Sequence, residues 1–238
     1  MHFTAPTAQF GKTVVLAYPD TTRLGGYRAA LGLWRSLGGD DSTLTKGQID
    51  AAPEETVETQ VSATDSEHIG VLIGTPPVPN NGATFVFVNG LPAAEHIPVF
   101  VDTLLAQFEA SDVEKVVVVS SANLSGVKGG GSERLFALTG LQGLPEISAG
   151  ACTGDAMLSA LDTLGRVSSL EMVVAVHGDK RPAEFGSEFA DEDDGRVVAV
   201  LGGVLAKAVA PGAAGVEVTA TRVKCGGEKA VQGLPAFG

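Results

Sequence analysis

The sequence predicts an α/β fold, a three-layer sandwich whose central sheet is mostly parallel or mixed. Short runs rich in Val and Ile are apolar at successive positions, which is typical of strands buried on both faces of a sheet. Segments with apolar residues at helical spacing lie between these runs along most of the chain. Such alternation favours helices packed on both sides of a sheet.

The predicted strands are the apolar runs. They are Thr13–Ala17, Ile69–Ile73, Thr84–Val88, Lys115–Ser120, Met172–His177, Val197–Leu201 and, with a weaker pattern, Val216–Ala220. The segment Gly74–Gly82 is rich in Pro, Asn and Gly, so it predicts a loop between two adjacent strands.

Four helices are expected between the strands, at Gly25–Leu37, Pro98–Glu109, Thr153–Leu164 and Val204–Val209. The acidic stretch at 183–195 is expected to be a loop. No linker divides the chain, so we expect a single α/β domain over residues 1–238, with a flexible C-terminal tail at 226–238.

The composition excludes some classes of partner and location. Of the 238 residues 44% are hydrophobic and only 5% aromatic, so the core must consist mainly of Val, Leu and Ala. The net charge is -12, and no Lys or Arg occurs from Gly47 to Glu114. A surface of that sign repels phosphate backbones, so nucleic acid is not an expected partner. No apolar stretch reaches the roughly 20 residues of a membrane helix.

Other compositional features predict an intracellular protein without cofactors. The N-terminus lacks the basic and apolar regions of a secretory signal, so we expect a cytoplasmic location, with the nucleus as a second compartment. Two cysteines do not form a disulfide framework. The four histidines lack metal-ligand spacing, so neither a metal nor a cofactor is expected.

One candidate catalytic motif is Gly150-Ala-Cys-Thr-Gly154, which has the glycine spacing of a nucleophile elbow with Cys152 as the nucleophile. His177, after an apolar run, is the candidate base. The acids between them are Asp155, Asp162 and Glu171. The alternative is a buried, inert cysteine at a tight turn into a helix, which we favour.

A second candidate is the end of the strand at Lys115–Ser120. Ser120 and Ser121 follow four valines, where α/β enzymes place catalytic or ligand-binding hydroxyls. Gly129–Gly131 could approach a phosphate, although a lone glycine run is also typical of a flexible connector. The sequence region lacks a histidine, so a scaffold role is the favoured interpretation.

The chain ends in Gly233-Leu-Pro-Ala-Phe-Gly238. An extended peptide with one aromatic anchor can dock on a partner, since the ring supplies contact area at low entropy cost. A frayed terminus is the alternative interpretation.

Three places resemble the proteasome assembly chaperones of the chaperone-one and chaperone-two type. The first is the helix and strand from Ile97 to Asn123. The second is the glycine-started helix Gly150–Ala160 with the apolar strand after it. The third is the ending Ala236-Phe237-Gly238, which is similar to the family's hydrophobic residue, aromatic (commonly Tyr) and final residue.

The resemblance implies a phosphorylase-like sandwich without catalysis. It implies a chaperone of 20S proteasome assembly that pairs with a related chain, through apolar helix faces, and holds proteasome α-subunits. Ala236, Phe237 and Gly238 would bind the α-subunits, and there would be no catalytic, cofactor or metal residues. The competing hypothesis is a thiol hydrolase that uses Cys152 and His177.

Overall fold

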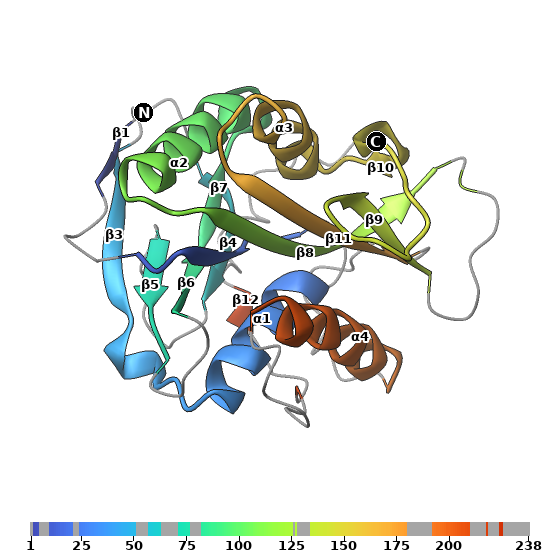
Figure 1. Ribbon diagram of the computed structural model, residues 1–238, viewed down its shortest axis with the longest axis horizontal. Helices are drawn as coiled ribbons and strands as arrows, with labels where there is room; N and C mark the ends of the chain where they lie inside the picture. Colours follow the sequence, from blue (N-terminus) through green and yellow to red (C-terminus); the bar gives the residue numbers. More distant parts are fainter. Residues whose placement is uncertain are drawn as a thin grey trace, which may run out of the picture.

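Figure 1 shows the computed structural model of the chain, a sheet with helices on both faces. The structure describes residues 2–4, 10–20, 24–50, 57–62, 71–76, 82–125, 127, 134–179, 192–209, 218 and 224–225. The α-helices in these ranges are α1 (Gly25–Ser36), α2 (Ile97–Ala110), α3 (Ala156–Gly165) and α4 (Glu192–Val209).

The main sheet is mixed, with a parallel centre. Its strands in spatial order are β1 (His2–Thr4), β3 (Thr45–Asp50), β5 (Val71–Gly74), β6 (Ala83–Val88), β2 (Thr13–Ala17), β8 (Lys115–Leu124), β11 (Glu171–Asp179) and β9 (Leu135–Thr139). The four central strands, β6, β2, β8 and β11, are parallel to one another. Their carboxyl ends therefore meet at one edge of the sheet.

Antiparallel strands flank this centre. β5, β3 and β1 continue the sheet beyond β6, and β9 lies beyond β11. The short β10 (Cys152–Thr153) pairs with the end of β8. A small second sheet joins β12 (Lys224–Cys225), β4 (Val57–Ser62) and β7 (Gly90–Pro92).

The three layers are held together by two hydrophobic cores, one on each face of the sheet. Successive residues of β8 point to opposite faces, so Val116 and Val118 pack with α2 and α3, whereas Val117 and Val119 pack with α1 and α4. Figure 1 shows α2 and α3 above the sheet and α1 and α4 below it. The predicted three-layer fold with a mixed sheet is therefore confirmed.

Most predicted elements agree with the structure. Five predicted strands correspond to β2, β5, β6, β8 and β11, and β5 and β6 are adjacent, as the turn-rich segment between them indicated. Three of the four predicted helices correspond to α1, α2 and α3. The third begins later than predicted, at Ala156, because Asp155 caps it through its side chain.

One prediction was wrong. Val197–Leu201 is not a strand but lies inside α4, which also begins twelve residues before the predicted helix start at Val204. Val198, Leu201, Leu205 and Val209 are buried at helical spacing, so the Val-rich run is one face of a helix on the sheet. Residues 192–195 of the predicted acidic loop belong to α4, and 183–191 lie outside the described residues.

The apolar helix faces are used within the fold. Phe100, Val101, Leu104 and Phe108 of α2 are fully buried against the sheet. In the part of the chain that the structure describes, the exposed large hydrophobic residues are Val99 and Val167. The buried faces of these helices pack on the sheet, and the expected dimer contact through apolar helix faces stays a prediction. No described helix is long and apolar enough to cross a membrane.

Candidate functional site

The central strands separate at their carboxyl ends. β2 pairs with β8 as far as Leu16 and Val118, while β8 continues beside β11 to Asn123. In many α/β proteins such a divergence opens a crevice where ligands bind. Here, buried polar side chains from 18–20 and 120–121 lie at this place, and they form two groups on opposite faces of the sheet.

The first group, the α1 junction, consists of Asp20, Ser121, Gly25 and Gly26. The Asp20 carboxylate accepts hydrogen bonds from Gly26 N (2.6 Å), Ser121 N (3.2 Å) and Ser121 Oγ (2.8 Å). Gly25 N donates to Ser121 Oγ at 3.1 Å. The N-cap residue of α1 is Leu24, whose side chain accepts no hydrogen bond, so Asp20 caps the helix from the end of β2.

Glycine is required where α1 meets β8. A Cβ at Gly26 would lie 2.0 Å from the Val119 carbonyl oxygen, and one at Gly25 would lie 2.8 Å from Ser121 Oγ. The first turn of α1 is therefore held directly against the strand backbone. This close approach places the helix N–H groups within reach of Asp20.

The second group, the α3 junction, consists of Tyr18, Ser120 and Asp155. Tyr18 Oη lies 3.0 Å from both Ser120 Oγ and Asp155 Oδ2. The other carboxylate oxygen, Asp155 Oδ1, accepts from Leu158 N at 2.9 Å. Asp155 thus caps α3 and ties it to the ends of β2 and β8 at the same time.

Burial dominates the electrostatics of both junctions. Only 3% of Asp20 and 4% of Asp155 is exposed. Burial raises the pKa of Asp20 to about 7 despite the donors around it, and also raises the pKa of Asp155. The pKa of Tyr18 lies well above its ordinary value, first because of burial and then because of the Asp155 charge.

The predicted strand-end hydroxyls are occupied by these contacts. Ser120 and Ser121 are 0% and 1% exposed, and each is hydrogen-bonded to a neighbour inside the protein. Neither hydroxyl faces solvent in this conformation. Of the adjacent loop, Gly126 and 128–133 lie outside the described residues.

The structure does not bring Cys152 and His177 together. Cys152 in β10 and His177 in β11 both pair with β8, on opposite edges of that strand. Strands lie about 4.8 Å apart, so the two backbones are roughly 10 Å apart. Cys152 also packs in the core beside α2 and α3, whereas the alternation along β11 places His177 on the α1 and α4 side.

The cysteine itself is a poor nucleophile. Burial, followed by the nearby Asp155 and Asp162 charges, raises the pKa of the Cys152 thiol to about 12. At neutral pH the sulfur therefore carries its proton, while the thiolate is the reactive form. Gly154 has a positive φ of 80°, so the glycine pattern serves a tight turn into α3.

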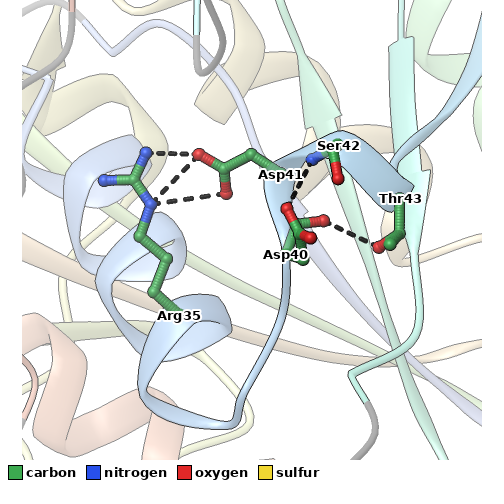
Figure 2. Close-up of polar contacts among 5 residues, drawn as sticks. All are labelled: Arg35, Asp40, Asp41, Ser42 and Thr43. Atoms are coloured by element: carbon green, nitrogen blue, oxygen red, sulfur yellow. Dashed lines mark hydrogen bonds and ion pairs between the residues drawn. The ribbon is translucent and has the colours of Figure 1, made fainter.

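The far end of α1 has a different arrangement of carboxylates, on the surface. Figure 2 shows the Arg35 guanidinium paired with the Asp41 carboxylate, with Arg35 Nε 3.1 Å from Asp41 Oδ2. The neighbouring Asp40 accepts from Ser42 N at 2.9 Å and so caps a short 3-10 helix, Asp41–Thr43. This hydrogen bond lowers the pKa of Asp40.

Sequence reasoning named three of the five buried polar residues of the two junctions. Ser120, Ser121 and Asp155 were candidates, the last as the acid of a hydrolase, but Tyr18 and Asp20 were not. The sequence does contain a pattern that could have identified Tyr18 and Asp20. They follow a buried strand and precede Gly25-Gly26, and polar residues in that position are typical of the start of a helix that packs on a sheet. No group of three or more potential metal ligands occurs among the described residues. Ala236, Phe237 and Gly238 lie outside them.

No protein-family model and no curated protein matches the sequence. Solved structures do match. PbaA from Pyrococcus furiosus, an archaeal homologue of proteasome-assembly chaperone, aligns with a TM-score of 0.56 and 16% identity over 87% of this chain and 84% of its own. The chain has the fold of proteasome-assembly chaperone homologues. The resemblance inferred from the sequence is therefore confirmed for the fold.

Two further structures share the fold. A proteasome-assembly chaperone homologue from Mycobacterium tuberculosis aligns with a TM-score of 0.51 and 15% identity, over 82% of this chain and 84% of its own. A protein of unknown function from Thermoplasma acidophilum aligns with a TM-score of 0.55 and 13% identity, over 84% and 76%. At these identities the likeness concerns the fold, and the function has to be argued separately.

Proposed function

We propose that this protein is a non-catalytic chaperone of 20S proteasome assembly. The observation that carries the proposal is the fold shared with PbaA and the Mycobacterium tuberculosis homologue over more than four fifths of the chain. The three sequence features that resemble the chaperone family support it independently. The matching location is the cytoplasm and, in a cell that has one, also the nucleus.

The arrangement of the strand ends supports a function without catalysis. In an α/β enzyme these ends carry groups that face a substrate. Here Ser120, Ser121 and Asp20 bond to one another or to neighbouring elements and hold helices in place. The thiol hydrolase alternative receives no support, because β8 separates Cys152 from His177.

We propose proteasome α-subunits and a related chaperone chain as the partners. The net charge of -12 favours binding to basic or mixed protein surfaces and opposes binding to nucleic acid. The Arg- and Lys-free stretch from Gly47 to Glu114 includes α2, whose outer face carries Asp102 and Glu109. A membrane partner is not part of the proposal.

Affinity capture tests the partners. The tagged full-length chain is expected to retain proteasome α-subunits and one paralogous chain from an extract of its own cells. The control is the same capture at high salt, where an acidic surface should lose affinity because salt screens charge interactions. Retention of neither partner at low salt would refute the proposal.

The last three residues of the sequence are the proposed anchor. Phe237→Ala should weaken binding to α-subunits, because it removes the aromatic contact area. Phe237→Tyr keeps the ring and introduces the hydroxyl that is common at this position in the family, so it should keep or increase affinity. Equal affinities for the native chain, both variants and a chain without Ala236–Gly238 would show that the tail has no role.

The thiol hydrolase alternative has its own test. Iodoacetamide at neutral pH should leave Cys152 unmodified in the folded protein and should label it after unfolding, because the buried thiol is protonated. Intact and peptide mass spectrometry distinguish Cys152 from Cys225. Rapid labelling of Cys152 in the folded protein would reopen the enzymatic interpretation.

A further inference from the structure

Two helices present outward faces of opposite charge on the two sides of the sheet. α2 covers one side and α4 the other, and each buries its apolar face in a different core (Figure 1). The opposite face of each helix points away from the sheet. These outward faces are therefore surfaces on which another protein can dock.

The outward face of α2 is apolar and acidic. We call it the acidic face, a stripe at helical spacing in which all members are exposed: Val99, Asp102, Ala106, Glu109 and Ala110. Val99 is 53% exposed, and with Val167 it makes up the exposed large hydrophobic residues of the described chain. No Lys or Arg occurs from Gly47 to Glu114, so α2 itself has no cation to neutralise Asp102.

The outward face of α4 carries positive charge. We call it the basic face, a stripe at the same helical spacing: Arg196, Ala199, Val200, Gly203 and Lys207. Arg196, Ala199 and Lys207 are exposed. An added Cβ at Gly203 would meet nothing within 4 Å, so the middle of this face is open. The acids of α4, Glu192–Asp194, begin the helix, where negative charge complements its dipole.

The two cations of the basic face differ from other exposed cations of the chain. Lys12, Arg35 and Arg166 each form an ion pair with a nearby carboxylate. Within the described residues, no ion pair involves Arg196 or Lys207. In a protein with a net charge of -12, two such cations on one helix face favour an acidic partner surface.

We propose that the basic face of one copy of this chain docks on the acidic face of a second copy. Ala106 on one helix and Ala199 and Gly203 on the other are small, so the two helices can approach to the roughly 8–10 Å of packed helices. Such an approach buries Val99 against the apolar middle of the basic face. It also brings Arg196 and Lys207 close to the carboxylates of α2, so the charges are complementary.

The proposed contact joins two different faces, so the copies associate head to tail. A copy that is bound through its acidic face keeps its basic face free on the other side of the sheet. Further copies are therefore added until a ring closes or a filament grows. The net charge of -12 opposes association, but at physiological salt the repulsion between charges more than about 8 Å apart is largely screened.

The first test measures self-association of the purified full-length chain. It contains no proteasome subunits, so its outcome is independent of the proposed function. Sedimentation velocity at neutral pH and physiological salt should show species larger than a dimer, whose share increases with concentration. A chain that stays monomeric up to about 1 mM would overturn the proposal, even if a captured paralogue binds the same faces.

Two charge-reversal variants separate a specific contact from an effect of net charge. Arg196→Glu with Lys207→Glu makes the basic face acidic, and Asp102→Lys with Ala106→Lys makes the acidic face basic. Glu109 is left unchanged because it accepts hydrogen bonds from Ser169. The first variant has more net negative charge and the second has less, yet each should associate at least about tenfold more weakly than the native chain. Stronger association of the second variant would indicate net charge alone and contradict the proposal.

Mixing the two variants restores one native pair of faces. The first variant keeps the native acidic face, and the second keeps the native basic face. An equimolar mixture should therefore associate again, although neither variant does so alone at the same concentration. The substituted residues are exposed, so circular dichroism should show that both variants are folded. A mixture of folded variants that stays monomeric would refute docking between these two faces.

The apolar part of the contact has a matched control. Val99→Ser should weaken association about fivefold, because it removes apolar area that docking buries. Val167→Ser removes the other exposed hydrophobic side chain, which lies outside both faces, and should have no effect. Gly203→Leu fills the open middle of the basic face and should prevent association while the helix is retained. Equal effects of the two serine variants, or unchanged association of Gly203→Leu, would contradict the proposed contact.

Discussion

The two ends of α1 hold the same residue type in opposite environments. At its start, Asp20 is buried, accepts three hydrogen bonds, and has its pKa raised to about 7. Near its end, Asp40 lies at the surface, accepts a hydrogen bond from Ser42, and has its pKa lowered. Asp41 beside it pairs with Arg35, as Figure 2 shows.

The comparison teaches that hydrogen bonds to a carboxylate do not by themselves set its charge. Both Asp20 and Asp40 accept from backbone N–H groups, and both cap a helical segment. The two pKa values differ because Asp20 is buried and Asp40 is exposed to solvent. Burial penalises the charged form of Asp20 more than its donors stabilise it. The buried end of α1 should therefore control stability, and the exposed end should adjust it only slightly.

The largest effect is expected from Gly26→Ala. The new Cβ would lie 2.0 Å from the Val119 carbonyl oxygen, so the start of α1 must move away from β8 and lose its bond to Asp20. We expect a loss of about 3 kcal/mol or more in the free energy of unfolding, measured by urea titration.

The matched control is Gly203→Ala in α4, where an added Cβ meets nothing within 4 Å. Alanine has a higher helix propensity than glycine, so this variant should be unchanged or more stable by up to about 1 kcal/mol. Similar effects of the two substitutions would refute the tight contact between α1 and β8.

A smaller but still substantial effect is expected from Asp155→Ala. The substitution removes the cap of α3 and leaves the buried Tyr18 hydroxyl with one partner fewer. Together these changes should lower the free energy of unfolding by about 2–3 kcal/mol. Asp155→Ser can still cap the helix, so it should recover part of the loss. Equal losses for both variants would mean that capping contributes nothing at this position.

The surface end of α1 should give the smallest effects. Asp41→Ala removes an exposed ion pair with Arg35, so we expect a change below about 1 kcal/mol. The effect of Asp40→Ala on stability should depend on pH. Because the folded pKa is lowered, the contribution is present above the ordinary carboxyl pKa and disappears as the pH falls through the lowered value. Thermal melts at pH 7 and pH 3 measure both effects.

The central sheet could be predicted because burial on both faces leaves an unmistakable composition. β2, β6, β8 and β11 each contain four or five consecutive apolar residues, most of them Val. The same rule misread Val197–Leu201, since a helix that packs on a sheet can also contain a short apolar run. β3 and β4 were missed, because strands away from the parallel centre contain Lys, Gln and Glu at several positions.

The strand-end contacts could be predicted only in part, because they join residues far apart in the chain. Ser121 stands out after its valines, but its partner Asp20 is 101 residues away. Tyr18 and Asp155 are separated by 137 residues. A sequence shows that polar groups end two strands, whereas only the fold shows that they bond to each other and are not left for a substrate. The prediction for Ala236, Phe237 and Gly238 stays open to experiment.

The most direct test of the account is binding and assembly with purified proteins. Proteasome α-subunits are incubated with the chain, alone and together with its captured paralogue, and the complexes are sized by native mass spectrometry. We expect a stoichiometric complex with α-subunits and faster formation of α-rings than without the chain. Absence of any complex, together with unchanged ring formation, would contradict the proposal that this fold serves proteasome assembly.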